Sequence, residues 1–382
     1  MGRMLKWTGI GLGGVIACAA LAAGILYLVT GPEGPPGDSP SAAALDAGAY
    51  AVGEAERTFV DTSRPTPSNG DYPGADGRTL LTTIWYPKEE VPGGSPLLIY
   101  SHGFMSDRFG GRYLAEALAR QGYVVASADF PLSSMNAPGG PNASDVVNQP
   151  GDVSFLIDSL LALDGDDKPY PGSIDSSRIG VAGLSLGGLT ATLVGYHPRL
   201  RDARIRAVVS IAGPAAMFTR RYFLTSQAPF LMVAGTEDAV VDYQTHAAGI
   251  PGRAPQAALV TIRGASHTAF VDLAEPAMRF MDHPDSIACD ALAAGQGDEA
   301  EDPFAGIGDA ADGINPAQTR LAICTHALGK ALHPGRQQMI TQVAVVSFLA
   351  AQFADAPAAR QAARELLRTA LTEDFPEVSV SS

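Results

Sequence analysis

Cysteines, basic residues and the common cofactor motifs are scarce in this sequence. Only three of its 382 residues are cysteine, and it contains no C-x-x-C, H-E-x-x-H or phosphate-loop pattern. Lys and Arg number 26 against 40 Asp and Glu, which gives a formal net charge of −14. This balance argues against a nucleic-acid partner, because phosphate binding needs clustered cations. The sequence therefore predicts a protein without metal, nucleotide or other cofactor.

Hydrophobic residues make up 46% of the chain, and short apolar runs alternate with segments of helical period. The predicted strands lie at 57–61, 79–86, 97–100, 123–128, 178–183, 207–211, 230–234 and 258–262. The predicted helices lie at 113–118, 153–163 and 186–196. Continuously apolar strands that alternate with helices indicate a mostly parallel central sheet with helices on both faces. The fold class is therefore α/β.

The amino-terminal segment indicates export. Arg3 and Lys6 precede an uncharged run at residues 7–30, which is long enough to cross a bilayer with its cationic end in the cytoplasm. We expect an uncleaved membrane anchor and an extracytoplasmic protein. A cleaved signal peptide and a lipoprotein modified at Cys18 remain alternatives.

Four segments follow from these patterns. Residues 1–30 are the anchor or signal peptide, and the Gly-, Pro- and Ser-rich residues 31–51 are a linker. Residues 52–356 form the α/β domain, in which 284–335 are an acidic insertion too poor in aromatic residues to fold alone. Residues 357–382 are a helical tail.

The insertion contains the remaining two cysteines, Cys289 and Cys324. In a non-reducing compartment such a pair is expected to form a disulfide, and two buried thiols are the alternative. After the insertion, residues 337–353 have the pattern of an amphipathic helix that closes the domain. The chain is expected to be loose from Phe375.

A candidate nucleophile stands between the strand at 178–183 and the helix at 186–196. Gly183-Leu184-Ser185-Leu186-Gly187 matches the G-x-S-x-G nucleophile elbow, a strained turn that projects a serine hydroxyl from the sheet. The pattern alone is common, but its place after a strand and before a helix favours Ser185 as a nucleophile. In proteins with this elbow, the acid and the base that activate the serine follow it in the chain.

The candidate acid follows the strand at 230–234. Asp238 is preferred, because side chains just beyond the carboxyl ends of parallel strands lie at the site edge of the sheet. Glu237 and Asp242 are the alternatives.

The candidate base is His267, which follows the last predicted strand. A serine hydroxyl is a weak nucleophile unless such a base accepts its proton. Among the seven histidines of the chain, His267 has the right order and context. His197 and His246 are expected to be surface residues.

An oxyanion hole needs two backbone N–H donors. Leu186, at the start of the helix after Ser185, would supply one of them. Phe104, in the loop Tyr100-Ser101-His102-Gly103-Phe104-Met105, would supply the other. His102 is expected to shape this loop rather than to act as a base.

Four segments carry a family resemblance. They are Trp85-Tyr86-Pro87, Ser101-His102-Gly103-Phe104, Asn148-Gln149-Pro150-Gly151-Asp152-Val153 and Gly183-Leu184-Ser185-Leu186-Gly187-Gly188. They resemble bacterial relatives of platelet-activating-factor acetylhydrolase, and are similar to dienelactone-hydrolase-like and cutinase-like polyester hydrolases. The resemblance covers roughly residues 52–275 and weakens in the insertion.

The resemblance implies an α/β-hydrolase fold and hydrolysis of carboxylic esters without metal or cofactor. It also implies that Ser185 is the nucleophile, His267 the base and Asp238 the group that orients the base. True dienelactone hydrolases use a cysteine nucleophile, so the serine here argues against that activity. Expected substrates are small-molecule or lipid esters with acetyl or short acyl groups, or polyesters.

Substrate choice is expected to depend on the loop 131–148 and on the insertion. Met105 and Phe109 are candidate pocket walls, although both could instead pack beneath their loop. An acyltransferase or a peptidase could use the same three side chains. A non-catalytic envelope protein built on a hydrolase scaffold is the alternative from a different class.

Overall fold

The computed structural model describes residues 30–295, 302–325 and 327–382. The chain divides into two units, Met1–Gly34 and Pro35–Ser382. The predicted membrane anchor and the lipoprotein alternative at Cys18 fall outside the described residues. Within the described ranges, no helix has both the length and the apolar character needed to cross a membrane.

Among the described residues, a nine-stranded sheet in the order β1-β2-β4-β3-β5-β6-β7-β8-β9 forms the centre of the second unit. Its strands are β1 Val52–Asp61, β2 Arg78–Pro87, β3 Ser95–Ser101, β4 Val124–Asp129, β5 Ile174–Leu184, β6 Ile205–Ile211, β7 Phe230–Gly235, β8 Ala257–Ile262 and β9 Val378–Ser381. The six neighbouring strands from β4 to β8 run parallel, while β1, β2 and β9 pair antiparallel. This confirms the predicted α/β fold with a mostly parallel sheet.

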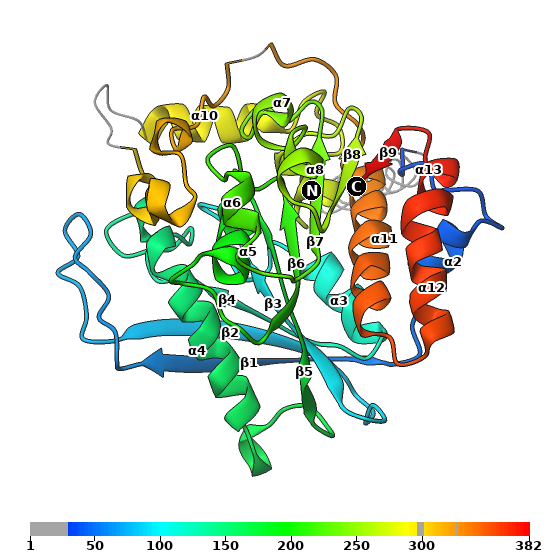
Figure 1. Ribbon diagram of the computed structural model, residues 1–382, viewed down its shortest axis with the longest axis horizontal. Coiled ribbons are helices and arrows are strands. Elements are labelled where there is room, and N and C mark those ends of the chain that lie inside the picture. Colours follow the sequence, from blue (N-terminus) through cyan, green and yellow to red (C-terminus); the bar gives the residue numbers. More distant parts are fainter. Residues whose placement is uncertain (1–29, 296–301, 326) are drawn as a thin grey trace, which may run out of the picture. The chain divides into compact units, whose positions relative to one another are not determined.

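Helices cover both faces of the sheet (Figure 1). They are α2 Pro40–Asp46, α3 Arg112–Arg120, α4 Gln149–Ala162, α5 Leu186–Tyr196, α6 Arg220–Phe223, α7 Tyr243–His246, α8 Ile250–Arg253, α9 Ala274–Met278, α10 Asp285–Gly295, α11 Pro334–Phe353, α12 Pro357–Glu365 and α13 Leu371–Asp374. On one face, α4 and α5 pack against the sheet, and on the other face α3 and α11 do so. The apolar runs of the parallel strands are buried between these layers.

The closing helix α11 differs from the amphipathic helix that the sequence indicated. Most of its residues are buried, and they lie on all sides of the helix. The reason is that α12 and α2 pack against its outer side, so α11 is an internal helix with little solvent-facing surface. Figure 1 shows α12 lying alongside α11.

The segment expected to be a linker contains the helix α2. Ser39 caps this helix by accepting a hydrogen bond from the Ala42 N–H at 3.1 Å, and Pro40 occupies its first turn, where a missing N–H costs nothing. The Ser41 N–H donates to Asp374 at 3.0 Å, which fixes α2 against the carboxyl-terminal helices. The linker prediction for 31–51 is therefore wrong for this helix.

The carboxyl terminus is also ordered, contrary to expectation. Phe375 is fully buried, and β9 pairs antiparallel with β8. Val378 and Val380 alternate with serines in β9, the period of an edge strand with one apolar face. The tail therefore completes the sheet instead of leaving it, and the prediction of a loose end is wrong.

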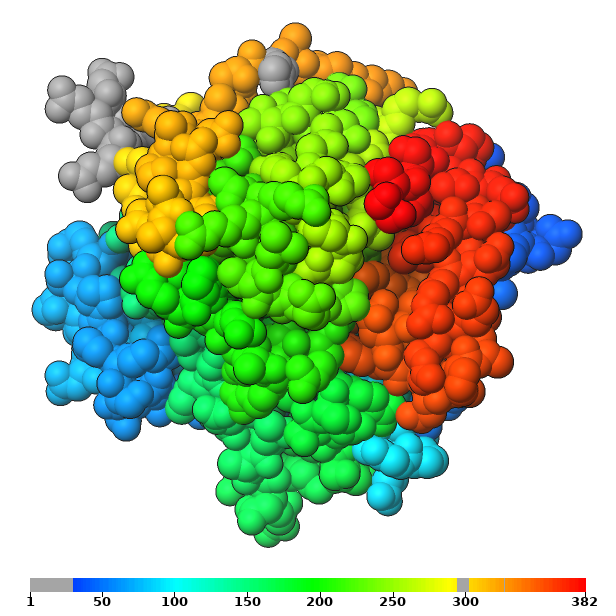
Figure 2. Space-filling model, viewed as in Figure 1, coloured from blue at the N-terminus to red at the C-terminus, as the bar shows by residue number. Residues whose placement is uncertain are grey.

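The described part of the insertion packs against the central part of the same unit. The Asn315 N–H donates to the Met217 carbonyl at 2.8 Å, and Ile314 forms an isolated bridge with Phe218. Figure 2 shows the orange atoms of this segment against the green atoms of the central loops. The predicted disulfide is confirmed, since Cys289 and Cys324 are bonded with their Cα atoms 5.7 Å apart.

Candidate active site

The three candidate side chains follow three strands of the parallel part of the sheet. Ser185 follows β5, Asp238 follows β7 and His267 follows β8. Because these strands pair parallel through β6, their carboxyl ends lie along one edge of the sheet. The fold thus brings the loops that carry all three residues to the same rim.

Ser185 has the backbone conformation of a strained turn. Its φ is 56° and its ψ is −117°, a region that residues with a Cβ rarely adopt. The Ser185 N–H donates to the Ile211 carbonyl at 2.8 Å, which ties the turn to the neighbouring strand. Leu186 begins α5 directly afterwards, so its N–H belongs to the first helical turn, where amides have no partner within the helix.

Two glycines of the motif are required because the chain passes so closely here. A Cβ at Gly187 would lie 1.9 Å from the Ser101 carbonyl oxygen, and one at Gly183 would lie 2.2 Å from the Gly187 carbonyl oxygen. Both distances are far inside van der Waals contact. The G-x-S-x-G spacing therefore reflects the approach of α5 to the end of β3.

Positive φ angles at non-glycine residues gather at this rim. In the described ranges they occur at Met105, Ser185, Ala212 and Cys324. Met105 lies in the loop after β3, and Ala212 directly follows β6. The Cys324 N–H donates to the Ala239 carbonyl at 2.6 Å, beside the candidate acid. Such strain is typical of functional sites.

The candidate acid and base are hydrogen-bonded to each other. His267 Nδ1 lies 2.8 Å from Asp238 Oδ2, and both side chains are almost fully buried. The other carboxylate oxygen of Asp238 accepts the N–H groups of Val240 and Val241, at 3.0 and 2.7 Å. The acid is therefore fixed by its own loop. Because a carboxylate can only accept a hydrogen bond, Nδ1 carries the proton, and in the neutral ring Nε2 then has none.

The two alternative acids are placed elsewhere. Glu237 is exposed, and its N–H donates to the Ala265 carbonyl at 3.0 Å. Asp242 caps α7 by accepting the Thr245 N–H at 2.8 Å. Asp238 is thus the acid that contacts the histidine.

The Asp238–His267 pair shifts the pKa of both residues. Burial alone would lower the pKa of His267, but the Asp238 carboxylate and, more weakly, Asp285 raise it, and the net direction is upward. Burial raises the pKa of Asp238, although the imidazole and the Val241 N–H oppose this effect. A histidine with a raised pKa is a stronger base once deprotonated.

The loop after β3 lies beside the serine. A Cβ at Gly103 would be 3.5 Å from the Ser185 Cβ. Phe104 is the next residue in this loop, so its backbone lies near the serine. His102 is fully buried, and its Nε2 accepts the Phe130 N–H at 3.1 Å while Nδ1 lies 2.7 Å from the Gly103 carbonyl. Because Nε2 accepts a hydrogen bond, Nδ1 must donate one. The ring is therefore neutral and links the loop at Gly103 to the backbone of Phe130. Burial also lowers the pKa of His102.

The two histidines expected at the surface are buried. His197 Nε2 lies 3.0 Å from the Ile307 carbonyl, so it connects the end of α5 to the insertion. His246 Nδ1 accepts the N–H groups of Ala215 and Ala216, and burial lowers its pKa to about 4. The expectation was wrong because both rings satisfy backbone groups, a role that sequence spacing does not reveal.

The predicted pocket residues differ in environment. Met105 is 42% exposed, whereas Phe109 packs edge-on against Trp85 with ring centroids 6.2 Å apart. Phe109 therefore corresponds to the alternative of packing beneath the loop. The Met105 N–H donates to the Ser133 carbonyl at 3.0 Å, so the predicted specificity loop 131–148 lies against the loop after β3.

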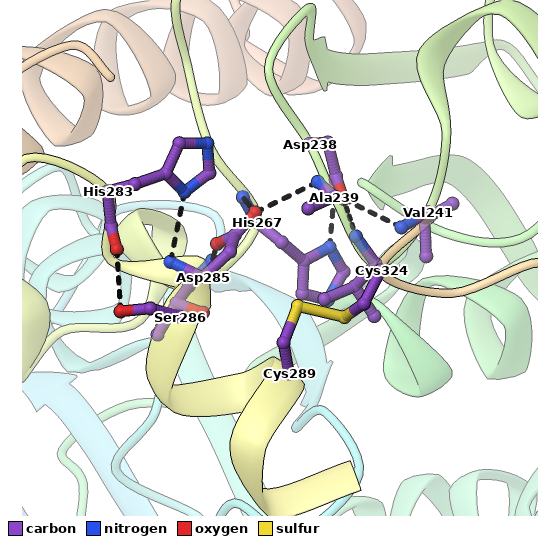
Figure 3. The surroundings of a disulfide bond; sticks show 11 residues. Asp238, Ala239, Val241, His267, His283, Asp285, Ser286, Cys289 and Cys324 are labelled. Atoms are coloured by element: carbon purple, nitrogen blue, oxygen red, sulfur yellow. Dashed lines mark hydrogen bonds and ion pairs between the residues drawn. A yellow bond between two sulfur atoms is a disulfide. The ribbon is translucent and has the colours of Figure 1, made fainter. Parts of the chain in front are cut away.

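Two polar residues that the sequence did not single out hold the loop of His267. Asp285, fully buried at the start of α10, accepts N–H groups on both sides of the Asp238–His267 pair. Gln337, on α11, accepts the Ser266 N–H at 3.0 Å and donates to the Ser266 carbonyl at 2.8 Å. The sequence offered only an aspartate in an acidic segment and a glutamine in a helix. Figure 3 shows Asp285 between the two loops.

The family of the chain follows from comparison with known proteins. The model of the PET hydrolase-like family matches residues 51–281, which is 231 of 382 residues and so more than half of the chain. The chain belongs to the PET hydrolase-like family. Membership of this family confirms the predicted α/β-hydrolase resemblance and makes the chain a carboxylic ester hydrolase.

A solved structure agrees with the family at the level of fold. The ferulic acid esterase from Streptomyces cinnamoneus superimposes with a TM-score of 0.58 at 20% sequence identity, over 88% of this chain and 99% of the esterase chain. In the part of this chain that the structure describes, His, Cys, Asp and Glu side chains form no group of three or more suited to a metal ion.

Proposed function

We propose that the protein hydrolyses esters through an acyl-enzyme formed on Ser185, with His267 as the base and Asp238 as the residue that orients it. The contact of 2.8 Å between His267 Nδ1 and Asp238 carries this proposal, because it leaves Nε2 as the proton acceptor. The strained Ser185 turn on the same rim supports it. A buried acid, a histidine and a serine in this chain order match the α/β-hydrolase arrangement.

In the first step, His267 Nε2 takes the Ser185 hydroxyl proton while Oγ attacks the ester carbonyl carbon. The carbonyl oxygen becomes an oxyanion, which the N–H groups of Phe104 and Leu186 stabilise. Each such donor contributes about 3 kcal/mol to the transition state. The tetrahedral intermediate expels the alcohol, which receives the proton from the imidazolium, and an acyl-serine remains.

In the second step, His267 takes a proton from water, and the resulting hydroxide attacks the acyl-serine. The second tetrahedral intermediate collapses, Ser185 Oγ recovers a proton from the imidazolium, and the carboxylic acid leaves. Asp238 stays ionised and stabilises the imidazolium in both steps. No redox change takes place and no cofactor is needed.

The proposed substrates are esters with acetyl or short acyl groups, lipid esters or polyesters. The family is described as PET hydrolase-like, and the superimposed structure is a ferulic acid esterase, so ester bonds are common to both descriptions. The exposed Met105 and Met135 flank the rim on adjoining loops, since the Met135 N–H donates to the Ser106 carbonyl at 2.8 Å. These apolar side chains suit an apolar acyl or polymer chain. Met105 is the proposed pocket wall.

We also propose an extracytoplasmic location, with the amino-terminal segment as membrane anchor. The Cys289–Cys324 disulfide supports this location, because disulfides persist in oxidising compartments. Export would be tested by fractionating cells that express the full chain and probing for the disulfide-linked protein outside the cytoplasm.

The function is tested with a panel of p-nitrophenyl acetate, butyrate and long-chain esters, together with peptides and alcohol acceptors. Wild-type residues 35–382, the second structural unit, are expected to hydrolyse the short esters, and Ser185→Ala is expected to lower kcat by about 10⁶-fold. Preferential cleavage of peptides or transfer to alcohols would instead favour a peptidase or acyltransferase. An unchanged rate in Ser185→Ala would refute the nucleophile.

A further inference from the structure

Asp285 joins the two loops that carry the acid and the base. Its Oδ2 accepts the Ala239 N–H at 2.9 Å and the His267 N–H at 3.0 Å, and its Oδ1 accepts the Thr268 N–H at 2.6 Å. Ala239 follows the proposed acid directly, and His267 is the proposed base. One carboxylate oxygen therefore sets the spacing between the backbones of these two loops.

The helix that carries Asp285 is itself linked to the loop after β7, which contains Asp238 and Ala239 and is called the acid loop below. Asp285 opens α10, and Cys289, one turn further along that helix, is bonded to Cys324. The Cys324 N–H donates to the Ala239 carbonyl at 2.6 Å. Ala239 is thus held through its N–H by Asp285 and through its carbonyl by the residue at the other end of the disulfide. Figure 3 shows these contacts around Ala239.

Burial of the Asp285 carboxylate costs free energy unless hydrogen bonds within the protein compensate for it. The residue is fully buried, and a buried carboxylate loses the solvation that water would provide. Three backbone N–H groups replace that solvation, and all three belong to the two loops of the site. None of the proposed catalytic steps requires Asp285 to touch the substrate.

We propose that Asp285 is a positioning residue for the ester hydrolysis, held in place by the Cys289–Cys324 disulfide, and that its negative charge strengthens His267 as a base. This inference rests on the proposed function of Ser185, Asp238 and His267. The insertion of the chain therefore serves the reaction itself, in addition to any contact with the substrate.

The charged groups around the imidazole agree with this role. Asp238 faces His267 from the loop after β7, and Asp285 faces it from α10, and both carboxylates raise the pKa of His267. From α11, the neutral Gln337 holds Ser266. On the side of α10, His283 Nδ1 accepts the Asp285 N–H at 3.3 Å. Removing the charge of Asp285 should therefore lower the pKa of His267.

The test compares Asp285→Asn and Asp285→Ala with the wild type and with Asp290→Asn. Asn keeps the shape of Asp285 but removes the charge and replaces one of the two acceptor oxygens by an NH₂ group. This NH₂ group is a donor, so it would oppose a backbone N–H that now has an acceptor. Asp290 is the matched control, because it lies on α10, is exposed and loses the same charge when replaced. Each variant is assayed for kcat, KM and the pH dependence of kcat/KM, and its folding is checked by circular dichroism.

We expect Asp285→Asn to lower kcat by about 100-fold with little change in KM, as a misplaced catalytic group does. We also expect the acid limb of its pH profile to move to lower pH, while Asp290→Asn matches the wild type. A wild-type kcat and profile in folded Asp285→Asn would overturn the proposal. A lower kcat with an unmoved acid limb would overturn it too, since this is what a purely structural loss produces.

Two measurements keep the inference separate from the proposed function and from misfolding. Fluorophosphonate labelling of Ser185 in the wild type, absent in Ser185→Ala, tests the function without involving Asp285. Should the Asp285 variants not fold, Cys289→Ser/Cys324→Ser releases α10 from the acid loop. A lower kcat and a shifted acid limb in this double variant would support the proposal, and wild-type values would overturn it.

Discussion

Ser185 is held by close backbone packing of its neighbouring glycines and by the adjoining strands, whereas Asp238 and His267 are held by hydrogen bonds from side chains of later helices. On the serine side, Gly183 and Gly187 let α5 approach the end of β3. On the acid–base side, Asp285 and Gln337 reach back from α10 and α11 to the loops after β7 and β8. The two halves of the site therefore depend on different kinds of contact, close backbone packing on one side and side-chain hydrogen bonds on the other.

This difference explains why the two halves should respond differently to change. Local geometry on the serine side is set by steric exclusion, so a substitution there disturbs the backbone directly. On the acid–base side, hydrogen bonds from side chains of α10 and α11 set the geometry, so substitutions there and the disulfide can tune the reaction without touching the substrate.

The largest effect is expected on the acid–base side, from His267→Ala. Without the imidazole, no group takes the Ser185 proton, and kcat should fall by about 10⁶-fold, as it does when a triad histidine is lost. The measurement is steady-state hydrolysis of p-nitrophenyl acetate by folded protein.

His246→Ala is the control for loss of a buried histidine. Ala215 and Ala216 would lose the acceptor of their N–H groups, which should destabilise the fold by about 1–3 kcal/mol. Its kcat should stay close to that of the wild type. An equal loss of kcat in both variants would contradict the role given to His267.

On the serine side, the sharpest change is His102→Ala. The Gly103 carbonyl and the Phe130 N–H would both lose their partner, and the Phe104 amide would no longer be held toward the oxyanion. We expect kcat to fall by about 100-fold, which corresponds to one lost oxyanion donor, with KM little changed. A kcat within twofold of wild type, measured on the same esters, would remove Phe104 from the oxyanion hole.

The mildest perturbation is pH itself, applied to the wild type. Protonated His267 cannot accept the serine proton, so activity should be lost as the pH falls through the pKa of His267. Because Asp238 and Asp285 raise this pKa, the acid limb should lie above the ordinary histidine value. A limb in the range of carboxyl groups, seen in kcat/KM from pH-jump assays, would mean that a different group is the base.

Much of the fold could be predicted, because the information is local. Apolar runs located all the strands up to β8, and the elbow motif located Ser185 from its neighbours alone. Chain order and strand ends then indicated Asp238 and His267, which the structure brings to 2.8 Å. The apolar runs, the elbow motif and the strand ends are short-range signals that appear in windows of a few residues, and only the order of the three side chains spans a longer part of the sequence.

The errors have a common cause in long-range packing. Val378 and Val380 become an edge strand only because β8 offers an unpaired side, and Pro40–Asp46 forms a helix that packs on α11 and α13. The roles of His197, His246 and Asp285 depend on backbone groups far away in the sequence. A single sequence contains no local signal for such partners.

The most direct test of the account is to react the enzyme with a fluorophosphonate probe and to locate the adduct by peptide mass spectrometry. We predict one adduct, on the peptide that contains Ser185, formed rapidly by the wild type and very slowly by His267→Ala. An adduct on another residue, or full esterase activity after Ser185 has been replaced by Ala, would contradict the account.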